Sequence, residues 1–459
     1  MLKKVVKNFF YITFGNVISQ VCTFLTYIYV ARRFGKSIYG MINLANAIIL
    51  YFSSMSWLGL QSLGIVIVNK NKKDGSDVCS SVNKIVSLRI LLSLASYAVL
   101  VLFTFLMKGN MQFKIIILID GLTILGASFL IDWFFNAVQE MKYTSISIMV
   151  KNFAFSLFVL FVLLSNVWNN IYAVPVGLTL GAFLCSLYLF IEYKRKYHHK
   201  FEFVFNLKEY RWLIKNSFPF CFSGMFALIN SNVDTLMLGI MKTSGEVGLY
   251  NSVYTIVNAL ILCIGFIYTP IYPTLIENFQ KKNFTGLGIS ISKLKKIIYI
   301  IAVPMFFSAF ILNKEVMNTV YGKEYSGAYK VFTILIVYVS ILFVREIYGY
   351  QLNAYNLQKK YMKVVMISSI YNIISNILII PHFGIEGAAF NTLISEIINI
   401  VLMRRYVNSA VKLQLHSVKI YKIIINAFVM SILILLLKKV TLNAIVLAAF
   451  GVFIYGIFT

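Results

Sequence analysis

Ionisable side chains interrupt long apolar runs at several places in this sequence. Asp234, Arg345, Glu346 and Glu396 lie well inside such runs. An ionised group in the middle of a bilayer costs about 2.5–3.5 kcal/mol on insertion scales, so its presence there needs a reason. A guanidinium offers a fork of donors to anions, and a buried carboxylate can take up a proton or a cation. These residues therefore predict a site that handles charged ligands or ions.

Arg345 and Glu396 stand out because each lies about midway along its apolar run. Further polar or aromatic residues lie near their helical faces, Thr392 and Asn399 for Glu396, and Tyr338 and Tyr348 for Arg345. An arginine in such a setting suits an anionic, sugar-bearing ligand. The alternative role is structural, in which Arg345 pairs with Glu396 or Asp234 and neutralises a buried carboxylate.

A second group of ionisable residues lies nearer the ends of the runs and consists of Arg89, Asp120, Asp132 and Lys151. Long side chains near a membrane interface can extend toward water while their stems stay in lipid. Interfacial snorkelling is therefore the favoured explanation for this group.

Polar stripes follow four of the apolar runs. In the first run Asn16, Gln20 and Tyr27 recur at helical spacing and share one face. The full set is Thr13, Asn16, Gln20, Thr23 and Tyr27 in the first run, Asn43 and Asn46 in the second, Ser223, Asn230 and Asp234 in the seventh, and Asn251, Tyr254 and Asn258 in the eighth. Hydrogen bonding between helices explains any one such residue. Four stripes on equivalent helices favour a hydrated cavity.

The elements that position these residues are predicted to be membrane-spanning helices. Of the 459 residues, 59% are hydrophobic and 13% are charged, and the mean hydropathy is +0.81. A spanning helix needs roughly 20 apolar residues. Fourteen runs of this kind cover residues 9–30, 40–68, 85–107, 115–137, 145–165, 171–192, 213–240, 248–275, 295–312, 331–353, 363–380, 385–403, 419–437 and 440–458. The expected fold class is an all-α polytopic membrane protein.

The distribution of positive charge predicts the orientation. With the N-terminus in the cytoplasm, cytoplasmic segments hold 28 of the 42 Lys and Arg residues and external segments hold 11. Because cytoplasmic loops retain Lys and Arg, both termini and the 194–212 loop are expected inside and the 314–330 segment outside. Arg32, Arg33 and Lys36 oppose this trend. No cleavable signal peptide is expected, because the first run is long and lacks a small-residue cleavage site.

Composition and spacing exclude several other functions. The net charge is +26, but the basic residues occupy short gaps between apolar runs, so a nucleic-acid partner is not expected. The five cysteines are far apart, the four histidines lie in loops or at helix ends, and the sequence contains no Gly-rich phosphate loop. No metal site, cofactor or catalytic centre is therefore expected, and an ion gradient or the substrate gradient is the expected energy source.

The sequence also repeats itself. Gly40 and Gly248 match at an offset of 208 residues, and Pro175 and Pro381 match at an offset of 206. Transporters place substrate between repeats of this kind. The expected architecture is two pseudo-symmetric six-helix lobes, residues 1–200 and 208–406, around a central cavity, with two further helices in residues 417–459.

Four stretches of the sequence carry motifs that occur together in one family. They are Ala31-Arg32-Arg33-Phe34-Gly35 through Tyr39-Gly40 with Trp57-Leu58-Gly59-Leu60; Asp132-Trp133-Phe134-Phe135-Asn136-Ala137 with Met141-Lys142-Tyr143; Asp234-Thr235-Leu236-Met237-Leu238-Gly239 with Val247-Gly248-Leu249-Tyr250 and Pro270; and Tyr321-Gly322-Lys323-Glu324-Tyr325 with Gly387-Ala388-Ala389 and Glu396. In this combination the chain resembles the bacterial flippases of lipid-linked polysaccharide repeat units, the polysaccharide transporter branch of the multidrug/oligosaccharidyl-lipid/polysaccharide superfamily. It departs from the usual O-antigen flippase pattern at Ala137 and Gln139, where that pattern has Gly and Glu.

The resemblance implies a flippase that moves undecaprenyl-diphosphate-linked oligosaccharide across the bacterial cytoplasmic (inner) membrane by alternating access. The product would serve assembly of capsule or of the O-antigen of lipopolysaccharide. The resemblance also implies that cations in a central cavity hold the anionic headgroup, and Arg345, Lys151 and Arg89 are the candidates. Asp234 or Glu396 would couple transport to H⁺ or Na⁺.

The polar stripes then supply the expected translocation path, represented by Asn16, Gln20, Tyr27, Asn251 and Asn258. Expected partners are the lipid-linked oligosaccharide, membrane lipids, a polysaccharide polymerase and a chain-length regulator.

Two other functions stay open for such a sequence. A cation-coupled drug or metabolite antiporter of the same superfamily would share the fold and the repeats. A polysaccharide polymerase would also span the membrane many times, but such enzymes typically carry a large external loop with arginines, whereas the external gaps here are short.

Overall fold

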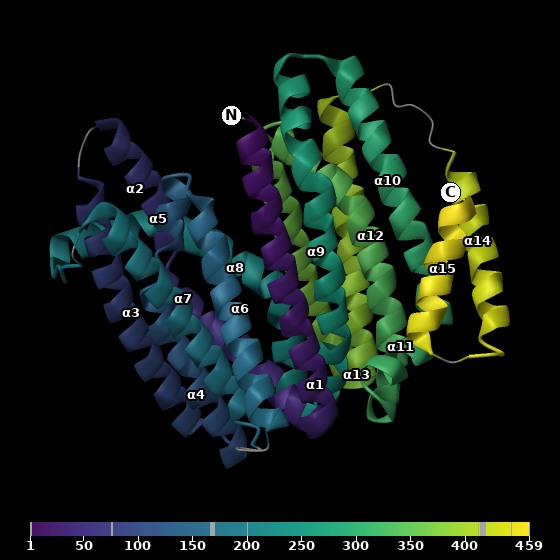
Figure 1. The fold of residues 1–459 in the computed structure, drawn as a ribbon, viewed down its shortest axis with the longest axis horizontal. Helices are drawn as coiled ribbons and strands as arrows, with labels where there is room; N and C mark the ends of the chain where they lie inside the picture. The colour runs from purple at the N-terminus through teal and green to yellow at the C-terminus, as the bar shows by residue number, and fades with distance from the viewer. Residues whose placement is uncertain are drawn as a thin grey trace. The chain divides into compact units, whose positions relative to one another are not determined.

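The chain is almost entirely helical where the structure describes it (Figure 1). The computed structural model describes residues 2–74, 77–165, 170–199, 201–411, 413, 419–441 and 443–458, with side chains from residue 15 onward except at 222–223, 226–227, 229–231 and 458. No β-strand occurs among these residues. The helices are α1 (Leu2–Trp57), α2 (Leu60–Asp74), α3 (Val78–Leu106), α4 (Met111–Ser128), α5 (Asp132–Ala137), α6 (Met141–Leu164), α7 (Ala173–Tyr197), α8 (Leu207–Met241), α9 (Ser244–Gln280), α10 (Phe284–Ile311), α11 (Asn313–Val320), the 3-10 helix η1 (Lys323–Ala328), α12 (Tyr329–Ala354), α13 (Gln358–Ala410), α14 (Ile420–Leu437) and α15 (Ala444–Phe458).

Among the described residues, ten helical stretches are long and apolar enough to cross a membrane. Two of them, Gly15–Asp74 and Gln358–Ala410, each overlap two of the predicted runs, because a kink joins neighbouring helices. Two shorter apolar helices, Asn232–Met241 and Ala444–Ile457, fall within the seventh and fourteenth runs. The prediction of an all-α polytopic membrane protein is confirmed.

Glycine produces both kinks. Gly35 within α1 has a φ of 77° and a ψ of 172°, and Gly384 within α13 has a φ of 55° and a ψ of −137°. Residues with a Cβ rarely adopt such positive φ values, so glycine lets the chain turn here without strain. The connections expected between the first two runs and between the eleventh and twelfth are therefore single sharp bends flanked by helix.

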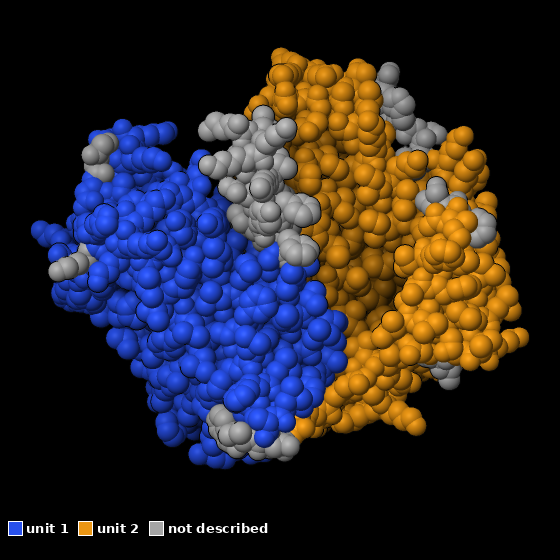
Figure 2. Space-filling view, viewed as in Figure 1, with its two compact units in different colours: residues 1–30, 41–232 blue, residues 31–40, 233–459 orange. Residues whose placement is uncertain are grey.

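The chain divides into two compact units (Figure 2). Residues 1–30 and 41–232 form the first unit, and residues 31–40 and 233–459 form the second. The 200–208 segment, predicted to separate two lobes, lies within the first unit. The predicted lobes and the cavity between them stay predictions.

Helix-end chemistry holds residues 31–40 in the second unit. The Arg32 guanidinium donates to the carbonyl oxygens of Thr319 and Val320, the latter at 2.7 Å, where α11 ends and its carbonyls lack helical partners. The backbone N–H of Lys36 donates to the Glu324 carboxylate at 3.0 Å. Of the three cations that oppose the charge trend, Arg32 is thus bound through its side chain and Lys36 through its backbone.

Gly40 and Gly248, the pair matched by the sequence repeat, permit close backbone contact in the same region. A Cβ on Gly40 would overlap the carbonyl oxygen of Ser244, and a Cβ on Gly248 would overlap that of Lys36. Small residues let membrane helices approach closely enough to pack backbone against backbone. The repeat therefore marks a point of contact between α1 and α9.

In the first unit an aromatic core surrounds α5. Trp133 and Phe134 are at most 1% exposed. The Phe134 ring meets Tyr193 and Tyr197 of α7 edge to face, with ring centroids 5.1 and 5.0 Å apart. On α2, a Cβ added to Gly64 would crowd the Trp133 indole. The α5 motif is thus a packing element that joins α2 and α7.

Candidate functional site

A buried carboxylate lies at the centre of a hydrogen-bond network in the second unit. Asp234, near the end of α8, is 6% exposed. Its Oδ2 accepts hydrogen bonds from the Tyr250 hydroxyl at 2.8 Å and the Thr392 hydroxyl at 2.6 Å. Its Oδ1 accepts a hydrogen bond from the Asn376 amide at 2.6 Å. Three neutral donors from α9 and the two halves of α13 therefore hold one carboxylate.

The kink in α13 brings these donors together. Asn391 Nδ2 donates to Asn376 Oδ1 at 2.8 Å, although residues 15 positions apart in a straight helix would be about 22 Å apart. The reversal at Gly384 makes this bond possible. Asn372 lies one turn before Asn376, with Asn372 Oδ1 3.0 Å from Asn376 Nδ2. The buried side chains of Asn372, Asn376 and Asn391 thus form one connected set of hydrogen bonds that reaches Asp234.

Charge neutralisation at Asp234 is incomplete. Among the described residues, no Lys, Arg or His side chain forms an ion pair with it. Burying an ionised carboxylate without a counter-charge is costly even when hydrogen bonds satisfy its oxygens. The arrangement is therefore suited to take up a proton or a monovalent cation, as the sequence analysis expects for Asp234.

Arg345 lies between two carboxylates. Its Nε donates to Glu396 Oε1 at 2.5 Å, and its Nη1 donates to Glu346 Oε1 at 2.7 Å. The side chains of Arg345, Glu346 and Glu396 are 10%, 18% and 5% exposed. Asn399, almost one turn farther along α13, donates to Glu396 Oε2 at 3.2 Å. With all three groups ionised, this cluster carries one surplus negative charge.

This pairing bears on the two roles considered for Arg345, both of which stay predictions. A guanidinium already bonded to two carboxylates can reach a phosphate only if a carboxylate moves away or is protonated. The observed partner is Glu396, joined by Glu346, whereas Asp234 is held by other donors. Because Thr392 and Glu396 are one helical turn apart on α13, the Arg345 cluster and the Asp234 network adjoin.

Arg89 is closed to a ligand in this structure. It is completely buried on α3, and its Nη1 and Nη2 donate to the carbonyl oxygens of Leu130 and Ala127, both at 2.5 Å. Ala127 lies in the last turn of α4, and Leu130 directly follows the C-cap residue Phe129. Arg89 does not extend to an interface, contrary to the snorkelling expected for it, but caps α4.

Lys151 differs from the other two predicted cations because it is exposed. It lies on α6, and its ammonium forms no ion pair or side-chain hydrogen bond among the described residues. The buried Asp120 carboxylate of α4 lies within electrostatic reach. Of the three predicted cations, Lys151 alone remains available to an anionic ligand.

The residues predicted to line a translocation path are divided between the units. Asn16, Gln20 and Tyr27 are half-buried on α1 in the first unit, and Tyr27 packs against Phe155 with ring centroids 5.4 Å apart. In the second unit Asn251 is buried and Asn258 is exposed. Asn251 Oδ1 accepts a hydrogen bond from Thr235 at 3.2 Å, beside Asp234. The side chains of Thr13, Ser223 and Asn230 lie outside the described residues.

Several members of the site were not singled out from the sequence: Tyr250, Asn372, Asn376 and Asn391. A signal was present for two of them, because Asn372 and Asn376 recur four residues apart in an otherwise apolar run. The same spacing marks the stripe of the first run.

The sequence profile of the family described as polysaccharide biosynthesis protein matches residues 5–279. The chain belongs to this family. The match covers the first three motif segments and confirms the family resemblance, and the fourth segment, from Tyr321 to Glu396, lies beyond it.

Relatives of this polysaccharide biosynthesis protein include two proteins of the archaeon Haloferax volcanii. A probable low-salt glycan biosynthesis flippase, Agl15, is 26% identical over 222 residues, which are 48% of this chain and 47% of the relative. A probable flippase, AglR, is 25% identical over 186 residues, 39% of this chain and 38% of the relative. The alignments thus span half or less of these relatives.

Among solved structures, this chain is similar to the lipid II flippase MurJ in an inward closed conformation. The TM-score is 0.76 with 18% identity, and the match covers 98% of each chain. An inward-facing multidrug resistance MATE family transporter of the MOP superfamily gives a TM-score of 0.68 with 10% identity, covering 85% of this chain and 95% of the transporter. The chain therefore shares the fold of these two membrane proteins.

Proposed function

We propose that this polysaccharide biosynthesis protein is a flippase that moves a lipid-linked oligosaccharide from the cytoplasmic to the outer leaflet of a membrane. The observation that carries the proposal is the combination of a polysaccharide biosynthesis family match with a MurJ-like fold over almost the whole chain. The names of the two archaeal relatives point the same way. Such a substrate needs a polar path for its phosphates and sugars, whereas its lipid tail can stay in the bilayer.

In finer terms, we propose an undecaprenyl-diphosphate-linked repeat unit as substrate and O-antigen or capsule assembly as the purpose. The protein would lie in a bacterial inner membrane with both termini in the cytoplasm, as the charge distribution suggests. A polysaccharide polymerase and a chain-length regulator are proposed partners downstream. Alternating access of two lobes is the proposed mechanism.

Ion coupling is proposed at Asp234. Its carboxylate is buried, is held by neutral donors from α9 and α13, and has no ion-pair partner among the described cations. Uptake of H⁺ or Na⁺ would remove the uncompensated charge and change the bonding between α8, α9 and α13. The donors on both halves of α13 would transmit that change along the helix to Glu396.

Anion binding is proposed at Lys151 rather than at Arg345 or Arg89. Lys151 is exposed on α6, whereas Arg345 is occupied by Glu346 and Glu396 and Arg89 by backbone carbonyls. A lysine ammonium acts as a point charge toward a phosphate. The expected consequence is that Lys151→Ala weakens substrate use without lowering folded yield.

Deletion of the gene in its own host tests the proposed function. Lipid-linked repeat units should then accumulate on the cytoplasmic face of the membrane. An oxidant that cannot cross the membrane, added to intact cells, should leave the sugars of these units unmodified because it does not reach them. Wild-type protein should restore surface glycan. The variant Lys142→Ala should restore it too, because Lys142 is an exposed lysine on α6, the helix that carries Lys151. Normal surface glycan in the deletion strain would contradict the proposal.

A second function is favoured by one observation, the surplus negative charge around Arg345 and Asp234. Acidic interiors suit cationic substrates, so a cation-coupled drug or metabolite antiporter is the alternative. It predicts uptake or efflux of soluble organic cations that depends on this chain, with surface glycan unaffected by deletion.

A further inference from the structure

A cluster of potential metal ligands lies in the first unit, apart from the residues assigned above. Asp77, Cys79 and His199 each place one ligand atom within 4.8 Å of the others. Asp77 and Cys79 lie at the start of α3, and His199 follows the end of α7, 120 residues after Cys79. We propose that these three residues bind a divalent transition-metal ion of the zinc class.

The ligand types fit this ion. Zn²⁺ takes thiolate sulfur, imidazole nitrogen and carboxylate oxygen at about 2.0–2.3 Å in tetrahedral geometry, which places ligand atoms roughly 3.5 Å from one another. The three ligand atoms lie within 4.8 Å of one another, so the tetrahedron needs at most a small approach of the side chains. Three protein ligands leave the fourth position to water, and the doubly charged ion balances one thiolate and one carboxylate.

The segment that carries His199 is fastened to α3. Phe201 packs against Phe190 of α7, with ring centroids 5.8 Å apart. The backbone N–H of Val204 donates to the Ser87 hydroxyl of α3 at 3.0 Å. His199 is therefore placed near the start of α3 by its own chain neighbours, before any ion is considered.

Asp77 and Cys79 are equally well placed. The two Asp77 carboxylate oxygens accept hydrogen bonds from the N–H groups of Cys79 at 2.8 Å and Ser80 at 3.2 Å and cap the first turn of α3. Each carboxylate oxygen has two acceptor positions, so capping leaves one free on each. The same helix start can thus keep its cap and ligate an ion.

Tyr193 supplies an independent indication. The residue is 1% exposed and its hydroxyl lies against Cys79 and near Asp77. Within the described part of the chain this hydroxyl forms no hydrogen bond to a nitrogen or oxygen atom, and the Cys79 sulfur is the group that lies against it. A metal-bound thiolate at Cys79, or water on the open position, would provide an acceptor for it. Outer hydrogen bonds of this kind orient metal ligands.

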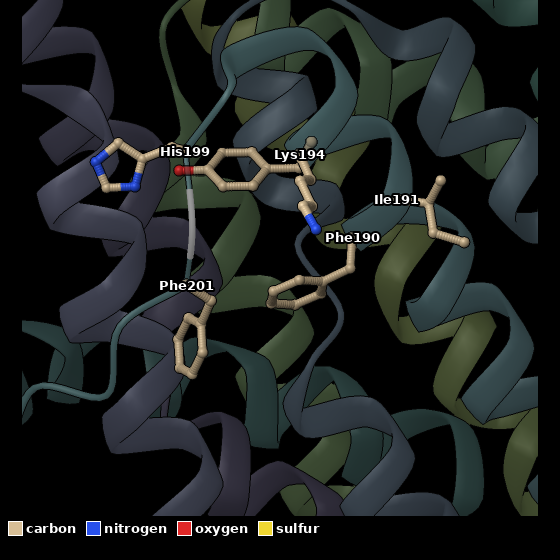
Figure 3. Close-up of a pocket in the computed structure, with 6 residues that line it drawn as sticks. Phe190, Ile191, Lys194, His199 and Phe201 are labelled. Atoms are coloured by element: carbon tan, nitrogen blue, oxygen red, sulfur yellow. The ribbon is translucent and has the colours of Figure 1, made fainter.

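A pocket of about 240 Å³ lies beside His199, and Tyr193 is also part of its lining. Figure 3 shows His199 and Phe201 on one side of this pocket with Lys194 and Phe190 across from them. The bound ion would link the start of α3 to the connection between α7 and α8.

Metal binding is tested with the purified full-length protein in detergent after removal of metals by a chelator. Zn²⁺ alone should bind at one equivalent per chain. Co²⁺ alone should give the charge-transfer absorption of a cobalt–thiolate bond. Zn²⁺ should also protect Cys79 of the wild-type chain from a maleimide, as located by peptide mass spectrometry. Absence of the cobalt–thiolate band, or unprotected Cys79, would overturn the proposal.

Variants separate this site from unspecific binding. Cys79→Ser and His199→Ala should each weaken Zn²⁺ binding at least about tenfold, and Asp77→Asn should weaken it less while keeping the helix cap. His198→Asn and Cys263→Ser should bind as the wild type does. Equal weakening by His198→Asn and His199→Ala would show adventitious binding only. The wild-type protection measurement decides the question even if a variant fails to fold.

Discussion

Arg345 Nε and Glu396 Oε1 lie 2.5 Å apart, although the two residues are 51 positions apart in the chain. This bond joins the middle of α12 to the second half of α13, and Glu346 adds a second carboxylate to the same guanidinium. The pair therefore makes Arg345 a counter-charge inside the second unit. Its removal would leave the buried Glu396 and the partly buried Glu346 without a cation.

Replacing Arg345 with alanine is expected to reduce the amount of folded protein. Removing one partner of a buried ion pair typically costs about 3–5 kcal/mol. The double variant Arg345→Ala/Glu396→Gln should recover part of the loss because one uncompensated charge is gone. Size-exclusion profiles and thermal unfolding in detergent measure both effects. Arg405→Ala, an exposed arginine on α13, should behave as the wild type.

A different result would restore the ligand-binding role of Arg345. If Arg345→Ala folds in normal amount but loses transport, and the double variant stays inactive, the guanidinium itself is needed for transport.

Asp234→Asn is expected to uncouple transport from its driving ion. The substitution keeps the side-chain volume and lets Tyr250 and Thr392 retain hydrogen bonds, but it removes the charge that attracts H⁺ or Na⁺. The increase in initial transport rate on imposing a pH or Na⁺ gradient should fall at least about tenfold with little loss of folded protein. Asp74→Asn, at an exposed position at the end of α2, is the control. An undiminished gradient response would argue against coupling at Asp234.

Alanine at Gly40 or Gly248 is expected to disrupt the contact of the first kink with α9. The added Cβ atoms would overlap the carbonyl oxygens of Ser244 and Lys36, and overpacking of this kind costs about 1–3 kcal/mol. Gly265→Ala on α9 is the matched control, because no atom lies near its Cβ position and alanine favours helix there. Thermal unfolding should therefore move down for the first two variants only. If Gly40→Ala unfolds at the same temperature as the wild type, α1 and α9 can move apart at this contact at little cost.

Orientation in the membrane is expected to follow the positive charges. In a cysteine-free background, Lys208→Cys should react with an impermeant maleimide only after the cells are opened, and Lys323→Cys should react in intact cells. Both positions are exposed in the structure, so a lack of reaction reports the membrane side rather than burial. Labelling of Lys208→Cys from outside intact cells would reverse the orientation.

The helical runs could be predicted from the sequence because lipid imposes one simple requirement, long apolar stretches with satisfied backbones. Asp234, Arg345 and Glu396 could be singled out because charge in such stretches is costly. Their partners could not be predicted in full. The bonds of Asp234 to Asn376 and Thr392 join positions 142 and 158 residues apart, and they depend on the register of α13 after its kink at Gly384.

Arg89 and the Asp77 cluster show the same limit. Spacing along the chain cannot show that Arg89 will cap α4 through backbone carbonyls, since every residue offers a carbonyl. Cys79 and His199 lack any metal-ligand spacing in the sequence, because the loop after α7 brings them together only once it packs on α3.

The most direct test of the flippase proposal measures how fast the purified protein moves a lipid-linked oligosaccharide between the leaflets of liposomes. No other cell component is present in this assay. A fluorescent polyprenyl-diphosphate oligosaccharide is incorporated in both leaflets, and an impermeant quencher reports the fraction that reaches the outer leaflet. With an imposed H⁺ or Na⁺ gradient, the wild-type protein should expose the inner-leaflet pool, and Asp234→Asn should not respond to the gradient. A rate equal to that of protein-free liposomes under every gradient, from protein shown to be folded, would contradict a flippase function.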